Sequence, residues 1–261
     1  GGLLYLPAWA LIAILVLLSL WRVGKGLALF ALLALGLVYG MGLWGEMVST
    51  LALVLAASLI ALLFGIPLGI AMARSDLVKT VTRPVLDLMQ TMPSFVYLIP
   101  AAMFFGLGQV PGTIATVIFA MPPAVRLTDL GIRTVDAEHV EAGLAFGCTR
   151  RQLLYKVQLP LALPSIMAGV NQTIMLALSM VVIASMIGAG GLGSTVLTGI
   201  QRLDVGQGFQ GGIAVVILAV ILDRITQSFG RGTGGGLGDI FGLRPLLRRV
   251  SGRPEKTEPA A

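Results

Sequence analysis

The stretch Met47–Ala73, MVSTLALVLAASLIALLFGIPLGIAMA, decides the fold class of this chain. It runs for 27 residues without a charged side chain, between Glu46 and Arg74. A helix needs about 20 mostly apolar residues to cross the hydrocarbon core of a bilayer. The stretch is therefore long enough to span a membrane as a helix, and it predicts a membrane protein.

The composition of the whole chain agrees with this prediction. Hydrophobic residues make up 56% of its 261 residues, and charged residues only 11%. Soluble domains carry about 25% charged residues, so this chain lacks the polar side chains that a water-facing surface requires. The single cysteine, Cys148, excludes an internal disulfide, and the lone His139 has no partners for a metal site. No metal, catalytic site or nucleic acid is expected, and we assign the net charge of +6 to loops.

Six further apolar stretches accompany the first, and together they predict an all-α membrane protein with about seven transmembrane helices. Pro93, Pro100, Pro122 and Pro123 fall in or near these stretches, where neighbouring helices can satisfy the freed carbonyl groups. The predicted spans are Leu4–Leu20, Leu27–Leu43, Met47–Ala73, Leu86–Leu107, Thr113–Leu130, Pro164–Ile187 and Phe209–Ile225.

The basic residues are distributed unevenly between the two sets of loops. Fifteen of the 18 Lys and Arg residues lie after the first, third, fifth and seventh stretches, and only Arg202 lies in a loop on the other side. The positive-inside rule places the basic loops in the cytoplasm. We therefore expect a multi-pass plasma membrane protein with its N-terminus outside and its C-terminus, a basic and disordered tail over 230–261 that contacts membrane lipid, in the cytoplasm.

The longest predicted cytoplasmic loop, 131–163, contains a spaced pattern of small and charged residues. Glu141-Ala142-Gly143 is followed after three residues by Gly147, and after nine more by Val157-Gln158-Leu159-Pro160. A short helix of small residues can enter a cleft in a partner, and a glycine allows the chain to reverse. Pro160 and Pro164 are expected to break the chain before it returns to the membrane.

This pattern resembles the docking motif of ABC importer permeases, which reads Glu-Ala-Ala, three residues, Gly, nine residues, Ile, any residue, Leu-Pro. Gly143 replaces the second Ala and Val157 replaces Ile, while the spacing is intact. The resemblance implies a cytoplasmic coupling helix within the segment 136–160, which transmits force from an ATPase. The residues that it implies for ATPase coupling are Glu141, Ala142, Gly143, Gly147, Leu159 and Pro160.

The resemblance extends over most of the chain, from about Met41 to Phe229. This part is similar to the permeases of osmoprotectant importers for glycine betaine and proline betaine. The resemblance rests on the stretches Met41–Trp44, Gln90–Pro100, Arg126–Arg133, Gly188–Gly193 and Leu197–Asp204. It implies a type I ABC importer permease of the bacterial inner membrane, with N-terminal helices over 1–45 and a core over 46–229. It also implies a homodimer, two cytoplasmic ATPase subunits that bind ATP and Mg, and an extracytoplasmic substrate-binding protein or domain. Permeases for choline, carnitine or another small solute share these features and remain an alternative.

Polar residues inside a span are costly and usually face protein or water. Ser165, Gln172 and Ser179 recur every seven residues, which is nearly two helical turns, so they form one stripe. Gln90, Ser94 and Tyr97 follow one another at spacings of four and three and form a second stripe. Both stripes are candidates for the translocation pathway, and Tyr97 could offer an aromatic face to a quaternary ammonium group. Hydrogen bonding between packed helices is the alternative for the stripe of Ser165, Gln172 and Ser179.

The remaining polar groups suggest no enzyme. Gly188–Thr195 has the glycines of a phosphate loop, but Ser194 stands where such a loop needs lysine, so a tight turn is expected. Arg126 and Asp129, like Asp223 and Arg224, are expected to form ion pairs that fix helix ends. A membrane scaffold or passive channel, which needs no ATPase, remains the alternative of another class.

Overall fold

The computed structural model of the protein describes residues 7–230, and all regular structure within this range is helical. The predicted tail over 230–261 lies almost entirely outside the described residues, as do residues 1–6. The elements are α1 (Ala8–Arg22), α2 (Lys25–Gly40), α3 (Trp44–Arg74), α4 (Asp76–Thr91), α5 (Phe95–Phe105), α6 (Gln109–Arg133), α7 (Ala137–Ala145), α8 (Arg150–Leu153), the π-helix η2 (Leu154–Gln158), α9 (Leu159–Ser185), α10 (Leu192–Gln201) and α11 (Val205–Gly230).

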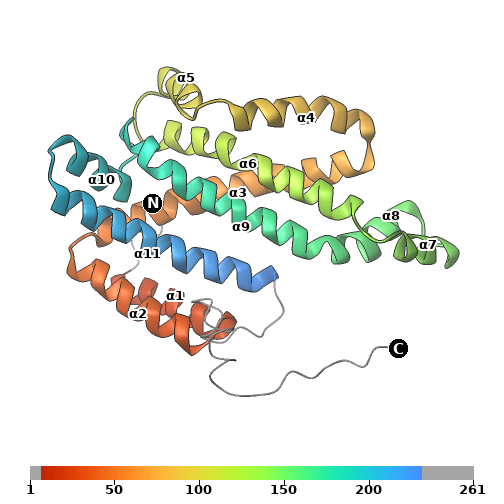
Figure 1. The fold of residues 1–261 in the computed structure, drawn as a ribbon, viewed down its shortest axis with the longest axis horizontal. Helices are drawn as coiled ribbons and strands as arrows, with labels where there is room; N and C mark the ends of the chain where they lie inside the picture. The colour runs from red at the N-terminus through yellow and green to blue at the C-terminus, as the bar shows by residue number, and fades with distance from the viewer. Residues whose placement is uncertain (1–6, 231–261) are drawn as a thin grey trace, which may run out of the picture.

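Every predicted span contains a helix, and four helices are long and apolar enough to cross a membrane. These four are α3, α6, the continuous run from α8 to α9, and α11. The first two predicted spans correspond to α1 and α2, which are apolar but only 15 and 16 residues long. They pack against each other and against α11 (Figure 1). The prediction of an all-α membrane protein is confirmed.

Helix α6 lies against both α3 and α9 (Figure 1), and glycines make this close approach possible. A Cβ on Gly69 of α3 would lie 2.6 Å from both the Thr128 Cβ and the Val125 carbonyl oxygen of α6. A Cβ on Gly131 of α6 would lie 2.7 Å from the Ser165 Cβ of α9. Membrane helices associate through van der Waals packing, so small residues at the contact strengthen it.

Of the five apolar clusters among the described residues, two bear on the predicted coupling segment and the bundle that carries it. The larger joins α1, α2, α3, α9, α10 and α11 and includes the fully buried Leu35, Val54 and Leu218. The smaller lies at the end of the molecule that carries α7 and α8, where Leu154 of η2 packs with Ile132 of α6. This second core connects the predicted coupling segment to the spanning helices.

The predicted span Leu86–Leu107 is broken at Pro93. α4 ends at Thr91, α5 begins at Phe95, and the two helices are bent by 95°. Pro93 has no N–H for an α-helical hydrogen bond, and it forces the preceding Met92 into an extended conformation, with ψ of 135°. The Tyr97 hydroxyl fastens the bend by donating a hydrogen bond to the Met89 carbonyl oxygen at 2.7 Å.

The expected break at Pro160 and Pro164 is also wrong, because the chain is helical from Arg150 to Ser185. Pro160 occupies the first turn of α9, where its missing N–H has little effect. The π-helix η2 lies directly before it, and the N–H of Leu159 donates to the Leu154 carbonyl oxygen, five residues back.

The glycine-rich stretch after α9 forms the expected tight turn. Gly188, Gly190 and Gly191 all have positive φ angles, between 73° and 82°. The turn is fastened to α3, because the N–H of Leu192 donates to the Thr50 Oγ1 at 2.8 Å. The sequence did not predict α10, the short helix that follows the turn.

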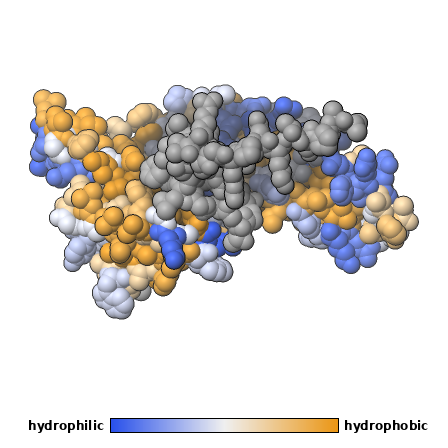
Figure 2. Space-filling model, turned by 60° about the horizontal axis from the view of Figure 1, so that its bottom comes forward, coloured by the Kyte–Doolittle hydropathy of each residue, from blue (hydrophilic) through white to orange (hydrophobic). Residues whose placement is uncertain are grey.

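The molecular surface is largely apolar, which suits a lipid environment, and it has one polar end. Figure 2 shows apolar residues across much of the visible face, with polar residues gathered at the right-hand end, where α7 and α8 lie. The outer face of α3 is apolar, since Leu59, Leu63 and Phe64 are all more than 60% exposed.

Replacing Gly69 by Ala is expected to destabilise the protein, because the added methyl group collides with α6. Overpacking costs about 1–3 kcal/mol, so we expect a lower midpoint of thermal unfolding in detergent. Gly36→Ala is the matched control, because a Cβ at this position of α2 meets no atom within 4 Å. Equal midpoints for the two variants would contradict the proposed close contact of α3 with α6.

Candidate functional site

The predicted coupling segment forms a compact projection at one end of the molecule (Figure 1). α6 ends at Arg133, and α7 carries Glu141, Ala142 and Gly143 before the chain turns into α8. The segment then runs through η2 into α9 without a break. The motif therefore joins α6 directly to α9.

Gly147 makes the turn that ends α7. Its φ is +78°, in the left-handed region that favours glycine. The N–H of Gly147 donates to the Leu144 carbonyl oxygen at 2.9 Å, and that of Cys148 donates to the Gly143 carbonyl oxygen at 3.0 Å. This pair of hydrogen bonds is the Schellman motif, which satisfies the last carbonyl groups of a helix.

The next helix begins with a capping box that the sequence analysis missed. The N–H of Gln152 donates to the Thr149 Oγ1 at 3.3 Å, and the N–H of Thr149 donates to the Gln152 Oε1 at 2.8 Å. A Thr followed by Gln three positions later is a recognisable signal for such a helix start. The two caps hold α7 and α8 in a defined relative orientation.

The structure gives a reason for glycine, rather than alanine, at position 143. Gly143 is buried, and a Cβ on it would lie 2.8 Å from the Leu153 Cδ1 and 3.7 Å from the Val157 Cγ2. The two departures from the family motif, Gly143 and Val157, therefore face each other. An alanine at 143 would require Leu153 to move.

The outer side of the projection is exposed and contains apolar side chains. Glu141 and Ala142 are exposed on α7. Leu144 is 51% exposed and Phe146 is 89% exposed among the described residues. An exposed phenylalanine suits burial against a partner protein. The helical spacing of Leu144 and Phe146 could not distinguish such an exposed position from a packed one.

The pathway candidates on α9 lie in different surroundings. Ser165 is half-buried against Gly131 of α6, so it contributes to helix packing. Gln172 and Ser179 are exposed on a face of α9 that no described residue covers. Ser179 donates its hydroxyl to the Met175 carbonyl oxygen at 2.9 Å. Only Gln172 and Ser179 therefore form a polar stripe on an open face.

The other three pathway candidates do not share one helix face. Gln90 is exposed on α4, Ser94 lies at the bend, and Tyr97 belongs to α5. Their spacing of three and four residues placed them together only on a continuous helix, which the break at Pro93 excludes. The Tyr97 hydroxyl is engaged by the α4 backbone, at 2.7 Å from the Met89 carbonyl oxygen.

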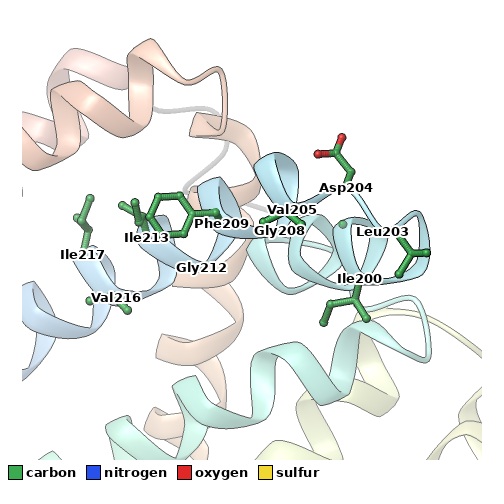
Figure 3. Close-up of a pocket in the computed structure, with 11 residues that line it drawn as sticks. Ile200, Leu203, Asp204, Val205, Gly208, Phe209, Gly212, Ile213, Val216 and Ile217 are labelled. Carbon is green, nitrogen blue, oxygen red and sulfur yellow. The ribbon is translucent and has the colours of Figure 1, made fainter.

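A groove of about 790 Å³ lies where α10 meets α11 (Figure 3). Its lining is almost entirely apolar and glycine, with Asp204 as its one carboxylate. The Asp204 Oδ1 accepts a hydrogen bond from the Gln207 N–H at 3.0 Å and so caps α11. None of the six pathway candidates lines this groove. Its residues are Gly199, Ile200, Leu203, Asp204, Val205, Gly208, Phe209, Gly212, Ile213, Val216 and Ile217.

A network of ion pairs joins α4 to the ends of α3 and α6. Asp129 is 8% exposed and pairs with Arg133 at 2.8 Å and with Lys79 at 3.7 Å. Arg133 also pairs with Asp76 at 2.8 Å and donates to the Met72 carbonyl oxygen at 2.7 Å. Asp129 is thus ion-paired at the end of α6, but its partners are Arg133 and Lys79 rather than the expected Arg126.

Two further polar contacts refine the predicted ion pairs. Arg126 pairs with Asp87 of α4 rather than with its neighbour Asp129. Asp223 of α11 accepts hydrogen bonds from the Asn171 Nδ2 of α9 at 2.9 Å and from the Gln227 Nε2 at 2.7 Å. These contacts hold α4 to α6 and α9 to α11. Within residues 7–230, no group of three or more His, Cys, Asp or Glu side chains could hold a metal ion.

Solved structures of ABC transporters share this fold. The chain matches an inward-facing MetNI methionine ABC transporter with a TM-score of 0.62 at 21% identity, covering 70% of this chain and 94% of that one. It matches an amino acid ABC transporter with a TM-score of 0.59 at 21% identity, covering 83% and 97%. The fold is that of type I ABC importer permeases, as the sequence predicted.

Curated relatives are similar over most of the chain. GbuB, the glycine betaine/carnitine transport permease protein of Listeria monocytogenes, is 58% identical over 229 residues, covering 86% of this chain and 81% of that protein. ProW, the glycine betaine/proline betaine transport system permease protein of Escherichia coli K12, is 54% identical over 230 residues, covering 88% and 65%. OpuAB, the glycine betaine transport system permease protein of Bacillus subtilis, is 52% identical over 227 residues, covering 87% and 80%.

The family model described as "binding-protein-dependent transport system inner membrane component" matches residues 65–234. This range contains the paired helices α6 and α9 and the whole predicted coupling segment between them. By its sequence, its fold and its relatives, the chain belongs to this family of transport permeases.

Proposed function

We propose that this chain is the membrane-spanning subunit of an ATP-driven importer for quaternary-amine osmoprotectants such as glycine betaine and proline betaine. The observation that carries the proposal is the projection Glu141–Pro160, which lies between α6 and α9 and continues into α9 as one helical run from Arg150. The substrate class is supported by the names of the relatives, which share more than half of their aligned residues with this chain.

In this proposal α7 and the turn at Gly147 enter a cleft in a cytoplasmic ATPase. Phe146 and Leu144 supply apolar contact area, while Glu141 supplies a carboxylate for a basic group of the partner. ATP and Mg bind to the partner, and this chain contributes no catalytic residue. Because Leu154 packs with Ile132, a movement of the projection reaches α6 and α9 together.

The pathway is proposed to lie along the open face of α9. Gln172 and Ser179 are polar, exposed and uncovered in the single chain, which suits a position beside a second copy. We therefore propose a homodimer with the pathway between the copies, and an extracytoplasmic binding protein or domain that delivers substrate. The projection faces the cytoplasm in this arrangement, with the N-terminus outside.

Carnitine or choline is the second candidate substrate, because the name of the L. monocytogenes relative includes carnitine. A choline permease of B. subtilis is 31% identical over 171 residues, well below the glycine betaine permeases. Glycine betaine is therefore the preferred substrate. A passive channel or scaffold would not need the coupling segment, and co-purification of an ATPase subunit distinguishes it.

The turn at Gly147 provides a test of coupling. We expect Gly147→Val to reduce substrate-stimulated ATP hydrolysis and uptake in proteoliposomes that contain the complete transporter. A left-handed conformation costs an L-residue about 1–2 kcal/mol, which corresponds to about a five- to thirty-fold loss of the folded turn.

Gly147→Asn is the matched control, because asparagine tolerates positive φ angles. A Cβ at position 147 meets no atom within 4 Å, so both side chains have space in this chain. We expect the Asn variant to keep most of its activity. Full activity in the Val variant would refute the role of the turn, whereas equal loss in both variants would point to direct contact of Gly147 with the ATPase.

Cysteine accessibility tests the proposed pathway. In a Cys148→Ser background, Gln172→Cys and Ser179→Cys are expected to react with a charged, membrane-impermeant thiol reagent, because a thiol must reach water to ionise. Leu63→Cys is the control, since Leu63 is 66% exposed on the apolar face of α3 and should remain unlabelled in lipid. Labelling of all three positions, or of Leu63→Cys alone, would exclude the pathway along α9.

Competition for uptake tests the substrate. In cells whose only betaine uptake is this transporter with its partner subunits, an excess of unlabelled proline betaine is expected to suppress uptake of labelled glycine betaine. Choline at the same concentration is expected to have little effect. Faster uptake of labelled choline or carnitine than of glycine betaine would favour the second candidate.

A further inference from the structure

A small pocket of about 260 Å³ lies between α4 and α6, at the end of the molecule nearest the projection. It is separate from the open face of α9 and from the groove at α10 and α11. Its lining has an apolar part and a cationic part. The lining residues are Met72, Lys79, Arg83, Leu86, Arg126, Leu127, Asp129 and Leu130.

Basic residues outnumber carboxylates in the cationic part, although Arg126 is already paired with Asp87 of α4. Lys79, Arg83 and Arg126 line the pocket, with Asp129 as the one carboxylate in the lining. Asp129 is already held by the Arg133 Nε at 2.8 Å, and Lys79 reaches it only at 3.7 Å. Among the described residues, Arg83 forms no ion pair or hydrogen bond. A guanidinium group without a partner, beside a loosely held ammonium group, favours an anion.

The outer face of α4 is apolar, and this favours an anion that also carries apolar chains. Leu77, Val81, Val85 and Leu88 follow one another at spacings of four, four and three, so they share one face of the helix. Each of them is between 51% and 76% exposed. α4 is therefore an amphipathic helix whose apolar face is open and whose basic residues line the pocket. This combination is typical of helices at the boundary between headgroups and acyl chains.

We propose that the pocket binds the phosphate group of an anionic phospholipid. The phosphate lies between Arg83 and Lys79, where two cations can donate charge-assisted hydrogen bonds to its oxygens. The acyl chains run along the apolar face of α4, from Leu77 to Leu88. Basic pockets between membrane helices bind anionic headgroups in this way. The site stands apart from substrate transport and does not depend on which osmoprotectant the protein carries.

Lipid retention by the full-length chain tests the proposal. The purified protein in detergent is titrated with phosphatidylglycerol or phosphatidylcholine, and bound lipid is measured by native mass spectrometry. We expect phosphatidylglycerol to bind more tightly than phosphatidylcholine. Arg83→Gln is expected to weaken phosphatidylglycerol binding by about ten-fold, the effect of one lost charge-assisted hydrogen bond of about 1.5 kcal/mol, and to leave phosphatidylcholine binding unchanged.

Arg74→Gln is the matched control, because Arg74 is exposed at the end of α3 and does not line the pocket. It should bind phosphatidylglycerol like the unmodified chain, and Arg83→Lys should retain part of the affinity. Equal losses in Arg74→Gln and Arg83→Gln, or no preference for phosphatidylglycerol in the unmodified chain, would overturn the site. Unchanged thermal unfolding of Arg83→Gln confirms that the variant is folded.

A second arm identifies the source of the phosphate group. Inorganic phosphate is added to the lipid-bound protein, with potassium chloride at the same ionic strength as a control. Retention of phosphatidylglycerol in both salts supports the lipid. Selective displacement by inorganic phosphate would overturn the lipid assignment and would identify the pocket as a site for a free phosphate-bearing anion.

Discussion

Helix α6 touches α3 and α9 at positions where any side chain larger than hydrogen would collide with its neighbour. Gly69, Gly131 and Gly169 mark these contacts, and a Cβ on any of them would lie within 3.2 Å of α6 or α9 atoms. Apolar area drives helix association only weakly in lipid, so this close fit is the main source of cohesion between the helices. The three helices consequently behave as one block, and the projection between α6 and α9 is attached to that block at both ends.

Much of the fold could be predicted because lipid permits few solutions. Long uncharged stretches must be helices, since each backbone group needs a partner within the segment. The bend at Pro93 could not be predicted, because proline interrupts some membrane helices and is tolerated in others. Pro93 and Pro160 illustrate this difference. The first ends α4, while the second fits the first turn of α9 after a π turn.

The local structure of the predicted coupling segment could be foreseen from the sequence, whereas the surroundings of the pathway candidates could not. The residues of the segment are neighbours along the chain, so their spacing indicates a short helix and a reversal at Gly147, which the structure shows as a Schellman turn. The pathway candidates become neighbours only through packing and, in the proposed homodimer, through association of two copies. Gln172 and Ser165 share a stripe by periodicity, yet one is open and the other is packed against α6. Periodicity identifies a helix face but does not show what covers it.

The π-helix over Leu154–Gln158 makes the orientation of α8 relative to α9 depend on the number of residues between them. A π turn accommodates one residue more than an α turn, and here it lies between the projection and α9. Removing that residue would rotate α8 by about 100° relative to α9 and would carry Leu154 away from Ile132. Over evolution, this segment should accept many substitutions but few single-residue insertions or deletions. The length of this segment is then what stays constant, because it keeps α8 in its rotational position relative to α9.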